Sequence, residues 1–329
     1  MSLTVLVTDY AFPDLDVEER VLGTVGARLL VAATGDEDEL IALAPRADAI
    51  LTNWKPVTAR VLDAAARCRT VARYGVGLDN IDVAHATTLG IPVSNVPDFC
   101  TDEVADHTLL LLLALARRFV PLTEDLRRGG WDNQAGGMPV RLRGKTLGLV
   151  GLGAIAQAVA VRARALGMDV IAYRRSAGDR DGVRVTTSLP ELLASADVVS
   201  LHVPLDATTR GIIGQAELAA MKDTAYLINT SRGALVDTAA LVRALDGGLI
   251  AGAAMDVTDP EPLPAAHPLR THPAAIVTPH SAFYSDGAIA ELAGKAARNV
   301  AQILRGEIPA TIVNPEVLDS PRLRRPGRP

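Results

Sequence analysis

Three short motifs in the C-terminal half of the chain contain the residue types that hydride transfer to a carbonyl group requires. They are Asn229–Gly233, Asp256–Pro262 and Thr278–Ala282. The first contains Arg232, which can hold a carboxylate through two parallel hydrogen bonds. The third contains His280, which can exchange a proton near neutral pH, and Glu261 of the second would orient the imidazole and favour its protonated form. Together they predict the proton partner that a carbinol oxygen needs when hydride joins its carbon.

Each motif follows a short apolar run that predicts a buried strand, at Ala225–Ile228, Gly252–Met255 and Ala275–Val277. Strands that alternate with helical segments pair in parallel, and ligands of such sheets gather at the carboxyl ends of the strands. We therefore expect the three motifs to lie together at one edge of a sheet.

A glycine-rich segment further upstream, Gly151-Leu152-Gly153-Ala154-Ile155-Ala156, lies between a predicted strand and a predicted helix. In this G-x-G-x-x-A pattern, Gly151 permits a tight turn and Gly153 lets a pyrophosphate approach the backbone. The helix N-terminus, with Ala154 and Ile155, would supply N–H donors and a partial positive charge. The context predicts a dinucleotide site. The alternative is an ordinary turn between strand and helix that happens to contain glycines.

Arg174 and Arg175 follow the next predicted strand, Asp169–Tyr173, where a site that prefers NAD places an acidic residue for the ribose 2′-hydroxyl. Arginine can bind a 2′-phosphate, which an acidic residue would repel. The sequence therefore favours NADP(H) as cofactor. NAD(H) is the alternative, in which case both arginines are solvated loop residues.

The composition is that of a globular chain about two domains long, with 329 residues of which 49% are hydrophobic and 22% charged. The net charge of −5 leaves no basic surface for nucleic acid.

Cys68 and Cys100 form no CxxC pair, which fits a reducing cytoplasm. The N-terminus lacks a basic leader, and the purest apolar run, Leu109–Ala116, is too short to span a membrane. The histidines show no metal-ligand spacing, so no metal is expected.

The order of apolar and polar segments divides the chain into two parts. Apolar runs alternate with helical segments over the first hundred residues, which predicts a small α/β domain. A long helix is expected from Thr101 to Arg118, apolar on every side and hence at a junction of domains or subunits, followed by an irregular arm over Gly129–Pro139. A second unit with six or seven parallel strands follows, then a helix over Asp286–Leu304 and a tail, Ser320–Pro329, whose arginines are expected to be solvated.

These ordered motifs resemble those of the D-isomer-specific 2-hydroxyacid dehydrogenases, from Val5 to about Leu318. Besides the glycine-rich loop and the arginine, glutamate and histidine motifs, Arg73–Asp82 is similar to that family's loop for the substrate carboxylate. Thr8–Tyr10 and Val96–Cys100 resemble the branch that also contains C-terminal binding protein, a corepressor with the dehydrogenase fold. Five motifs in one order make the resemblance specific.

The resemblance implies an α/β fold of two doubly wound domains with parallel sheets. A flavodoxin-like substrate domain would comprise residues 1–100 and 286–319, and a Rossmann dinucleotide-binding domain residues 101–285, with a disordered tail over 320–329. It also implies an active site in the cleft between the domains, and a homodimer formed through the long helix and the arm.

At the matching catalytic positions, the resemblance implies that Arg232 binds the substrate carboxylate and carbonyl, that His280 is the acid/base, and that Glu261 is its partner. Two residues depart from the family pattern. Ala154 stands where many members carry an arginine or another polar residue near the pyrophosphate, and Arg174 replaces the usual acidic residue. The first could weaken cofactor binding and the second shifts the expected cofactor, but neither removes a catalytic group.

The resemblance also implies binding residues. The backbone amides of Val76 and Gly77 would hold the substrate carboxylate, with the bulky Tyr74 beside them. Asp256 would contact the nicotinamide carboxamide, and Val104 would pack near the nicotinamide ring. The remaining expected cofactor contacts are His202, Pro204, Thr230 and Ser231.

The function expected from these features is that of an NAD(P)H-dependent oxidoreductase that interconverts a 2-keto acid and a D-2-hydroxy acid, with glyoxylate or hydroxypyruvate as small substrates. The alternative from another class is a dimeric binding protein that senses dinucleotide and recruits partners without turnover, like the corepressor. Among enzymes, formate dehydrogenases resemble this pattern too, but they are expected to carry glutamine where this chain has Glu261. Oxidation of phosphite stays open.

Overall fold

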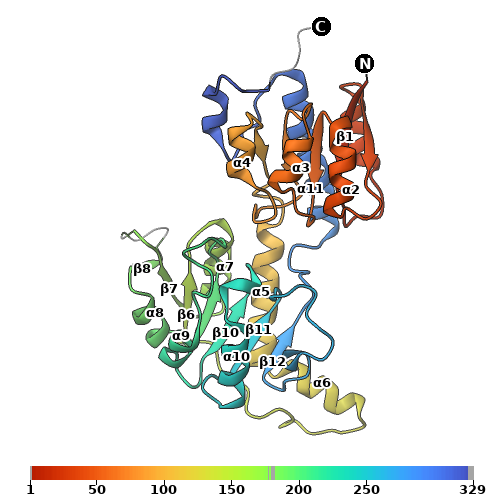
Figure 1. Cartoon of the computed structure of the whole chain (residues 1–329). Helices are drawn as coiled ribbons and strands as arrows, with labels where there is room; N and C mark the ends of the chain where they lie inside the picture. Colours follow the sequence, from red (N-terminus) through yellow and green to blue (C-terminus); the bar gives the residue numbers. More distant parts are fainter. Residues whose placement is uncertain (1, 177, 179–181, 325–329) are drawn as a thin grey trace. The chain divides into compact units, whose positions relative to one another are not determined.

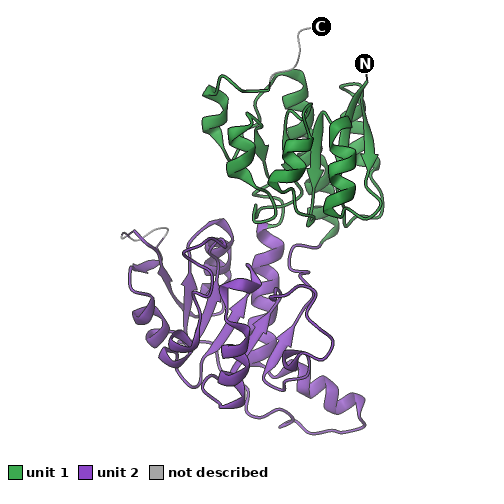
Figure 2. Cartoon of the chain, viewed as in Figure 1, with its two compact units in different colours: residues 1–100, 285–329 green, residues 101–284 purple. Residues whose placement is uncertain are grey.

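The computed structural model describes residues 2–176, 178 and 182–324 of the chain. It forms two compact units, coloured separately in Figure 2. Unit 1 contains the residues up to Cys100 together with those from Ser285 onward, and unit 2 runs from Thr101 to Tyr284. Unit 1 is therefore assembled from both ends of the chain.

Unit 1 is built on a five-stranded parallel sheet in the order β2-β1-β3-β4-β5. Its strands are β1 Leu3–Val7, β2 Ala27–Val31, β3 Ala49–Thr52, β4 Val71–Arg73 and β5 Val93–Ser94. Its helices are α1 Asp16–Gly23, α2 Glu37–Leu43, α3 Ala59–Ala64, α4 Val83–Thr88 and α11 Asp286–Arg305, with 3₁₀ turns η1 Ala44–Arg46 and η4 Pro315–Asp319 (Figure 1).

The core of unit 1 explains why its strands are continuous apolar runs. Val5, Leu6 and Val7 of β1 are fully buried, as expected for a parallel sheet whose two faces are both covered. Helix α11 starts at the N-cap Ser285, whose hydroxyl accepts from an N–H of the first turn, and it packs against α1, β3 and β4. The C-terminal end of the chain thus completes the domain that the N-terminal end begins.

Unit 2 is built on a seven-stranded parallel sheet in the order β12-β11-β10-β9-β6-β7-β8. Its strands are β6 Thr146–Val150, β7 Asp169–Tyr173, β8 Arg184–Thr186, β9 Val198–Leu201, β10 Tyr226–Asn229, β11 Gly252–Met255 and β12 Ala275–Val277. Its helices are α5 Thr101–Ala116, α6 Phe119–Arg127, α7 Ala154–Ala165, α8 Leu189–Ser195, α9 Gln215–Ala220 and α10 Thr238–Asp246, with 3₁₀ turns η2 Gly233–Leu235 and η3 Pro268–Arg270.

The strand order of unit 2 fixes where a ligand can bind. β6 is the first strand in sequence but lies between β7 and β9, so the winding of the chain reverses there. In open parallel sheets, ligands bind outside the carboxyl ends of the strands at this switch point. The predicted pair of parallel α/β sheets is confirmed, and the segments after β6, β9, β10, β11 and β12 are those that carry the predicted site.

The long predicted helix is shorter than expected. α5 ends at Ala116, because Arg118 adopts a left-handed conformation with φ of 54°, and a second helix, α6, begins at Phe119. No residue of α6 is buried, although its apolar residues Phe119, Leu122 and Leu126 recur at the spacing of one helix face. Leu110 and Leu113 of α5 are exposed, so this helix is not covered on every side within the chain.

Two arginines in the described part of the tail form hydrogen bonds with unit 1, although the sequence predicts them to be solvated. Arg322 donates to the carbonyl of Thr88, and Arg324 donates to the carbonyls of Ala65 and Cys68 in unit 1. The prediction of solvation is therefore wrong for the guanidinium of Arg324, which binds carbonyl groups just after α3, whereas Arg322 is exposed. Arg325 and Arg328 lie outside the described residues. Within the described ranges, the structure has no helix that is both long and apolar enough to cross a bilayer.

Candidate active site

The loop after β6 has the geometry of a phosphate-binding turn. Gly151 adopts φ of +101°, and its N–H donates to the carbonyl of Tyr173 at 3.0 Å. A Cβ at Gly151 would lie 2.5 Å from the carbonyl oxygen of His202. Both the conformation and the close approach therefore require glycine at position 151.

The fold itself does not require glycine at position 153. It is the N-cap of α7, it has no side chain to cap the helix, and a Cβ built on it would meet nothing within 4 Å. The protein itself therefore does not demand glycine here, whereas a ligand that approaches the backbone would. With Ala154 exposed and Ile155 half-buried in the first turn, the N-terminus of this 12-residue helix fits the pyrophosphate of a dinucleotide.

The residues predicted beside the dinucleotide lie at the ends of the neighbouring strands. Arg174 and Arg175 follow β7 directly, and the structure shows no hydrogen bond or ion pair of either guanidinium with another described residue. His202 follows β9, and its Nε2 lies 2.9 Å from the hydroxyl of Ser200. Burial lowers the pKa of His202 to about 4, so this histidine is neutral at physiological pH. Pro204, two residues further on, is exposed.

The loop that carries Arg232 is fixed by short-range hydrogen bonds. The Asn229 side chain accepts from the N–H of Ser231 at 3.0 Å and donates to the carbonyl of Arg232 at 2.8 Å. The hydroxyl of Ser231 donates to the carbonyl of Val203 at 2.7 Å. Gly233 packs so closely on the next loop that a Cβ there would collide with the backbone of Thr258. The arginine loop is thereby held against the segment that carries the glutamate.

Glu261 and His280, which the sequence predicts to be an acid/base pair, are in contact. Oε2 of Glu261 lies 2.9 Å from Nδ1 of His280, and Oε1 accepts from the N–H of Thr258 at 2.9 Å. With Nδ1 engaged, Nε2 is the ring nitrogen that can exchange a proton with a ligand. The His280 ring also packs edge-on to Phe283, with ring centroids 6.0 Å apart.

The surroundings of Glu261 favour its charged form. Partial burial opposes ionisation of the carboxyl group. The hydrogen bond and charge of His280, the N–H of Thr258 and the charge of Arg232 outweigh that effect and hold the pKa of Glu261 below its usual value. The arginine therefore lies close enough to this pair to influence it electrostatically.

Asp256 fixes the loop that carries His280 through several hydrogen bonds. Its side chain is only 1% exposed, and Oδ1 accepts from the Thr278 hydroxyl at 2.5 Å and from the Ser281 N–H at 2.9 Å, while Oδ2 accepts from the Ala282 N–H at 3.0 Å. These partners flank His280 on both sides. The carboxylate thereby fixes a loop in which His280 adopts φ of 52°, a conformation that few non-glycine residues take. A contact of Asp256 with the nicotinamide stays a prediction.

Thr230 and Val104 both contact Thr108 of helix α5. The Thr108 hydroxyl donates to the carbonyl of Val104 at 2.7 Å and lies 3.0 Å from the hydroxyl of Thr230. Val104 is buried in the same helix. The structure therefore brings most of the predicted unit 2 residues to the carboxyl edge of the sheet, around the ends of β6, β9, β10, β11 and β12.

The predicted carboxylate loop lies in unit 1, after β4. Among the described residues, nothing accepts a hydrogen bond from the N–H of Val76 or Gly77, while the carbonyl of Val76 accepts from Asn95 at 2.7 Å. Gly75 gives the loop its sharp turn, with φ of +137°. The loop thus presents two backbone donors, as an anion site requires.

Tyr74, which the sequence predicts beside the substrate, is buried in unit 1. Its ring is 1% exposed and packs edge-on to Phe12, with centroids 5.2 Å apart. The side chain belongs to the core of unit 1, directly after the buried strand β4. A contact of Tyr74 with the substrate stays a prediction.

Two residues of this network were not assigned to the site from the sequence. Thr278 bonds to Asp256, and Thr108 approaches Thr230. Thr278 belongs to the Thr278–Ala282 motif, so the sequence could have predicted it as a site residue. Thr108 lies in an apolar helix, where no motif marks it.

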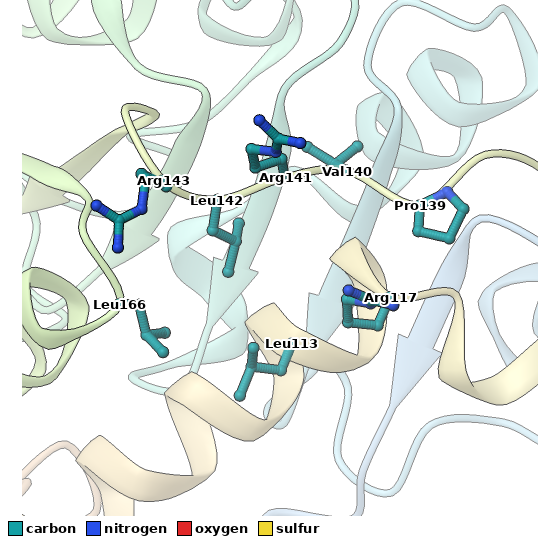
Figure 3. A pocket seen from close by; sticks show the side chains of 8 residues that line it. All are labelled: Leu113, Arg117, Pro139, Val140, Arg141, Leu142, Arg143 and Leu166. Atoms are coloured by element: carbon teal, nitrogen blue, oxygen red, sulfur yellow. The ribbon is translucent and has the colours of Figure 1, made fainter.

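A separate pocket of about 470 Å³ lies in unit 2, away from these residues (Figure 3). It is formed by the end of α5, the segment Pro139–Arg143 and Leu166 after α7, and three arginines stand at its wall: Arg117, Arg141 and Arg143. None of the predicted site residues lines it. Among the described residues, no group of three or more histidine, cysteine or acidic side chains could hold a metal ion.

Comparison with known proteins points in the same direction. Residues 109–282 match the family described as "D-isomer specific 2-hydroxyacid dehydrogenase, NAD binding domain". The chain is 40% identical to a glyoxylate reductase of Korarchaeum cryptofilum over 306 residues, which are 91% of this chain and 89% of that protein.

Two solved structures show the same fold. The NADPH-dependent glyoxylate/hydroxypyruvate reductase of Sinorhizobium meliloti, in complex with NADP and malonate, is 29% identical, with a TM-score of 0.86 and all of both chains covered. The D-lactate dehydrogenase of Aquifex aeolicus, complexed with NAD and lactic acid, is 27% identical, with a TM-score of 0.82 over 92% of this chain and 96% of that one.

Proposed function

The chain belongs to the D-isomer specific 2-hydroxyacid dehydrogenases, and from this membership we propose that it reduces a small 2-keto acid, glyoxylate or hydroxypyruvate, to the D-2-hydroxy acid with NAD(P)H. The relative at 40% identity is named for glyoxylate, and a structural neighbour for glyoxylate and hydroxypyruvate. The observation that carries the proposal is the contact of His280 with Glu261, close to Arg232.

The residues at the carboxyl edge of unit 2 divide the chemistry between them. Bound NAD(P)H supplies a hydride to C2 of the keto acid. Nε2 of His280 gives its proton to the oxygen that becomes the hydroxyl, so the product leaves as the hydroxy acid and His280 is left neutral. Arg232 polarises the carbonyl and binds the carboxylate. Glu261 accepts from Nδ1 and so stabilises the charged imidazole before transfer.

The experiment that tests this function is the initial rate of NADPH and NADH oxidation with glyoxylate, hydroxypyruvate, pyruvate and phenylpyruvate. His280→Ala should lose about 10²–10⁴-fold in kcat with the fold intact by circular dichroism, because general acid catalysis contributes that much. His85→Ala is the matched control, since His85 also contacts a carboxylate, Asp63, but in unit 1. An unimpaired His280→Ala enzyme would refute the assignment.

The cofactor preference rests on the end of β7. We propose that Arg174 favours NADP(H), because its guanidinium has no partner among the described residues and can bind a 2′-phosphate. One neighbour holds NADP and another NAD, so the family admits both. The ratio of kcat/KM for NADPH to that for NADH should fall at least tenfold in Arg174→Asp. It should not change in Arg127→Asp, which alters an exposed arginine of α6.

The corepressor-like alternative is not favoured by these relatives, which are named as reductases and dehydrogenases. It predicts measurable dinucleotide binding without turnover of any of the four acids. Such a result in the same assay would replace the enzymatic function by the binding one.

A homodimer is the assembly that the resemblance predicts. Exposed large apolar side chains on α5, on α6, in the arm and at α7 support it, because exposed apolar residues of this size are typical of protein–protein interfaces. They are Leu110, Leu113, Phe119, Leu126, Trp131, Met138, Val161 and Leu166. A second copy of the chain would bury this surface.

A further inference from the structure

Two consecutive residues of α5 reach the two loops that carry the catalytic side chains. His107 Nε2 lies 3.1 Å from the Thr278 hydroxyl and 3.5 Å from Oδ1 of Asp256. Thr108 lies 3.0 Å from the hydroxyl of Thr230. One turn of a single helix therefore contacts the loop of His280 and the loop of Arg232 at once.

The direction of the hydrogen bonds between His107 and the histidine loop follows from proton counting. A threonine hydroxyl has one proton, and that of Thr278 is donated to Asp256 at 2.5 Å. Nε2 of His107 must therefore carry the proton and donate it to Thr278. His107 is thus a donor in a chain that runs from α5 through Thr278 to the carboxylate of Asp256.

This series of hydrogen bonds is almost inaccessible to water. The side chain of His107 is 15% exposed and that of Asp256 1%. Buried hydrogen bonds to a carboxylate are costly to leave unmade, because water cannot replace the lost partner. Removing the His107 donor would leave the Thr278 oxygen without one hydrogen bond in this nearly closed site, and we expect Thr278 and the loop of His280 that follows it to shift.

We propose that His107 is a positioning residue of the reductase, which sets the orientation of His280 through Thr278 and Asp256. The proposal rests on the proposed function, since it concerns the histidine assigned to proton transfer. His107 touches neither substrate nor cofactor in this account. It acts only by holding the histidine loop in the conformation with φ of 52° at His280.

The test compares two substitutions of His107. His107→Leu removes the donor at similar volume, and we expect kcat to fall about 10–100-fold, while the KM for the keto acid and the Kd for NAD(P)H stay within about twofold. His107→Gln keeps an N–H donor and should recover most of the lost kcat. A purely structural role would instead lower Tm for both variants and change binding and kcat together.

A double-mutant cycle tests the route through Thr278 even if one variant is unstable. Thr278→Val removes the hydroxyl at constant volume, and in a connected chain the double variant His107→Leu, Thr278→Val should be no slower than the slower single variant. Multiplied losses would show that the two residues act separately, and an unchanged kcat in His107→Leu would refute the proposal.

Measuring His280→Ala in the same assay distinguishes a failure of the positioning role from a failure of the proposed function. If His280→Ala is inactive while His107→Leu is fully active, only the positioning role fails. If the unmodified chain turns over no keto acid, the proposed function itself fails.

Discussion

Histidines in unit 2 differ in what their surroundings allow them to do. His280 contacts the carboxylate of Glu261 at 2.9 Å, whereas His202 meets only the Ser200 hydroxyl and burial lowers its pKa to about 4. A proton donor at neutral pH needs a neighbour that stabilises its charged form, and a neutral imidazole in a buried position cannot supply the proton. The contact with Glu261 therefore supports the proposal that His280 is the acid/base, whereas His202 is a neutral hydrogen-bonding group that follows β9.

The charge of Glu261 should be visible in the pH dependence of the reaction. Because its pKa is lowered, the carboxylate stays charged down to a pH below the ordinary value of 4.5, and its support of His280 is lost only as the pH falls through that lowered pKa. Glu261→Gln carries no charge at any pH, so we expect kcat to fall about 10–100-fold and this acid limb to disappear. The measurement is kcat against pH for both proteins.

Glu217→Gln is the matched control for that substitution. Glu217 also accepts from a backbone N–H, that of Gly214 at the start of α9, but it lies outside the catalytic loops. A pH profile that changes equally in both variants would contradict the role of Glu261.

At the scale of elements, the β6–α7 turn separates what the fold requires from what a ligand requires. Gly151 is imposed by the turn, because a side chain would meet the backbone of His202. Gly153 faces open space at the N-terminus of a helix. The turn thus requires glycine at position 151 but not at position 153, where we predict that a ligand requires it; the sequence alone does not distinguish the two.

Substituting each glycine by alanine tests this distinction. Gly151→Ala should destabilise the chain by about 1–3 kcal/mol, because it forces a positive φ and a clash onto a residue with a Cβ. Gly153→Ala should lower Tm less than Gly151→Ala does, by no more than the modest cost of alanine at an N-cap, and raise the Kd for NAD(P)H at least tenfold, because its methyl group would keep a pyrophosphate from the backbone. Thermal unfolding and dinucleotide titration of both variants are the measurements. Unchanged binding in Gly153→Ala would contradict the assigned phosphate site.

Helices α5 and α6 show the limit of pattern reading at this scale. The apolar run from Leu109 predicts a helix correctly, and its end is displaced only because Arg118 turns left-handed. α6 has apolar residues at helical spacing, Phe119, Leu122 and Leu126, but none of them is buried within the chain. A helix whose apolar side chains point outward is stabilised by something other than the core of its own domain, and Phe119 and Leu126 are its exposed apolar residues.

At the scale of the molecule, that exposed surface predicts a dimer. Light scattering should give about twice the mass of one 34.5 kDa chain, and Phe119→Asp should shift the mass toward that of one chain, because a charge replaces an exposed aromatic ring at the expected interface. Ile308→Asp is the control, since Ile308 is equally exposed but lies in unit 1. A single-chain mass for the unmodified protein would contradict the predicted assembly.

The sequence by itself determined the features that depend on near neighbours along the chain. The parallel α/β sheets follow from short apolar runs between helices, and the glycine-rich turn follows from its position between β6 and α7. Arg232, Glu261 and His280 were identified because each residue type follows a strand end, and the structure brings the last two into contact. Such signals are local, so they can be read without knowing the packing.

Only the tertiary structure decided which distant side chains share a hydrogen bond. His107 and Thr278 are 171 residues apart in sequence, and Asp256 meets the loop of His280 from a neighbouring strand. It also showed that Tyr74 is buried in unit 1, and that Arg324 binds carbonyl groups of unit 1 instead of solvent. The physical reason is that side-chain direction and burial depend on the packing of whole elements, which no short stretch of sequence records.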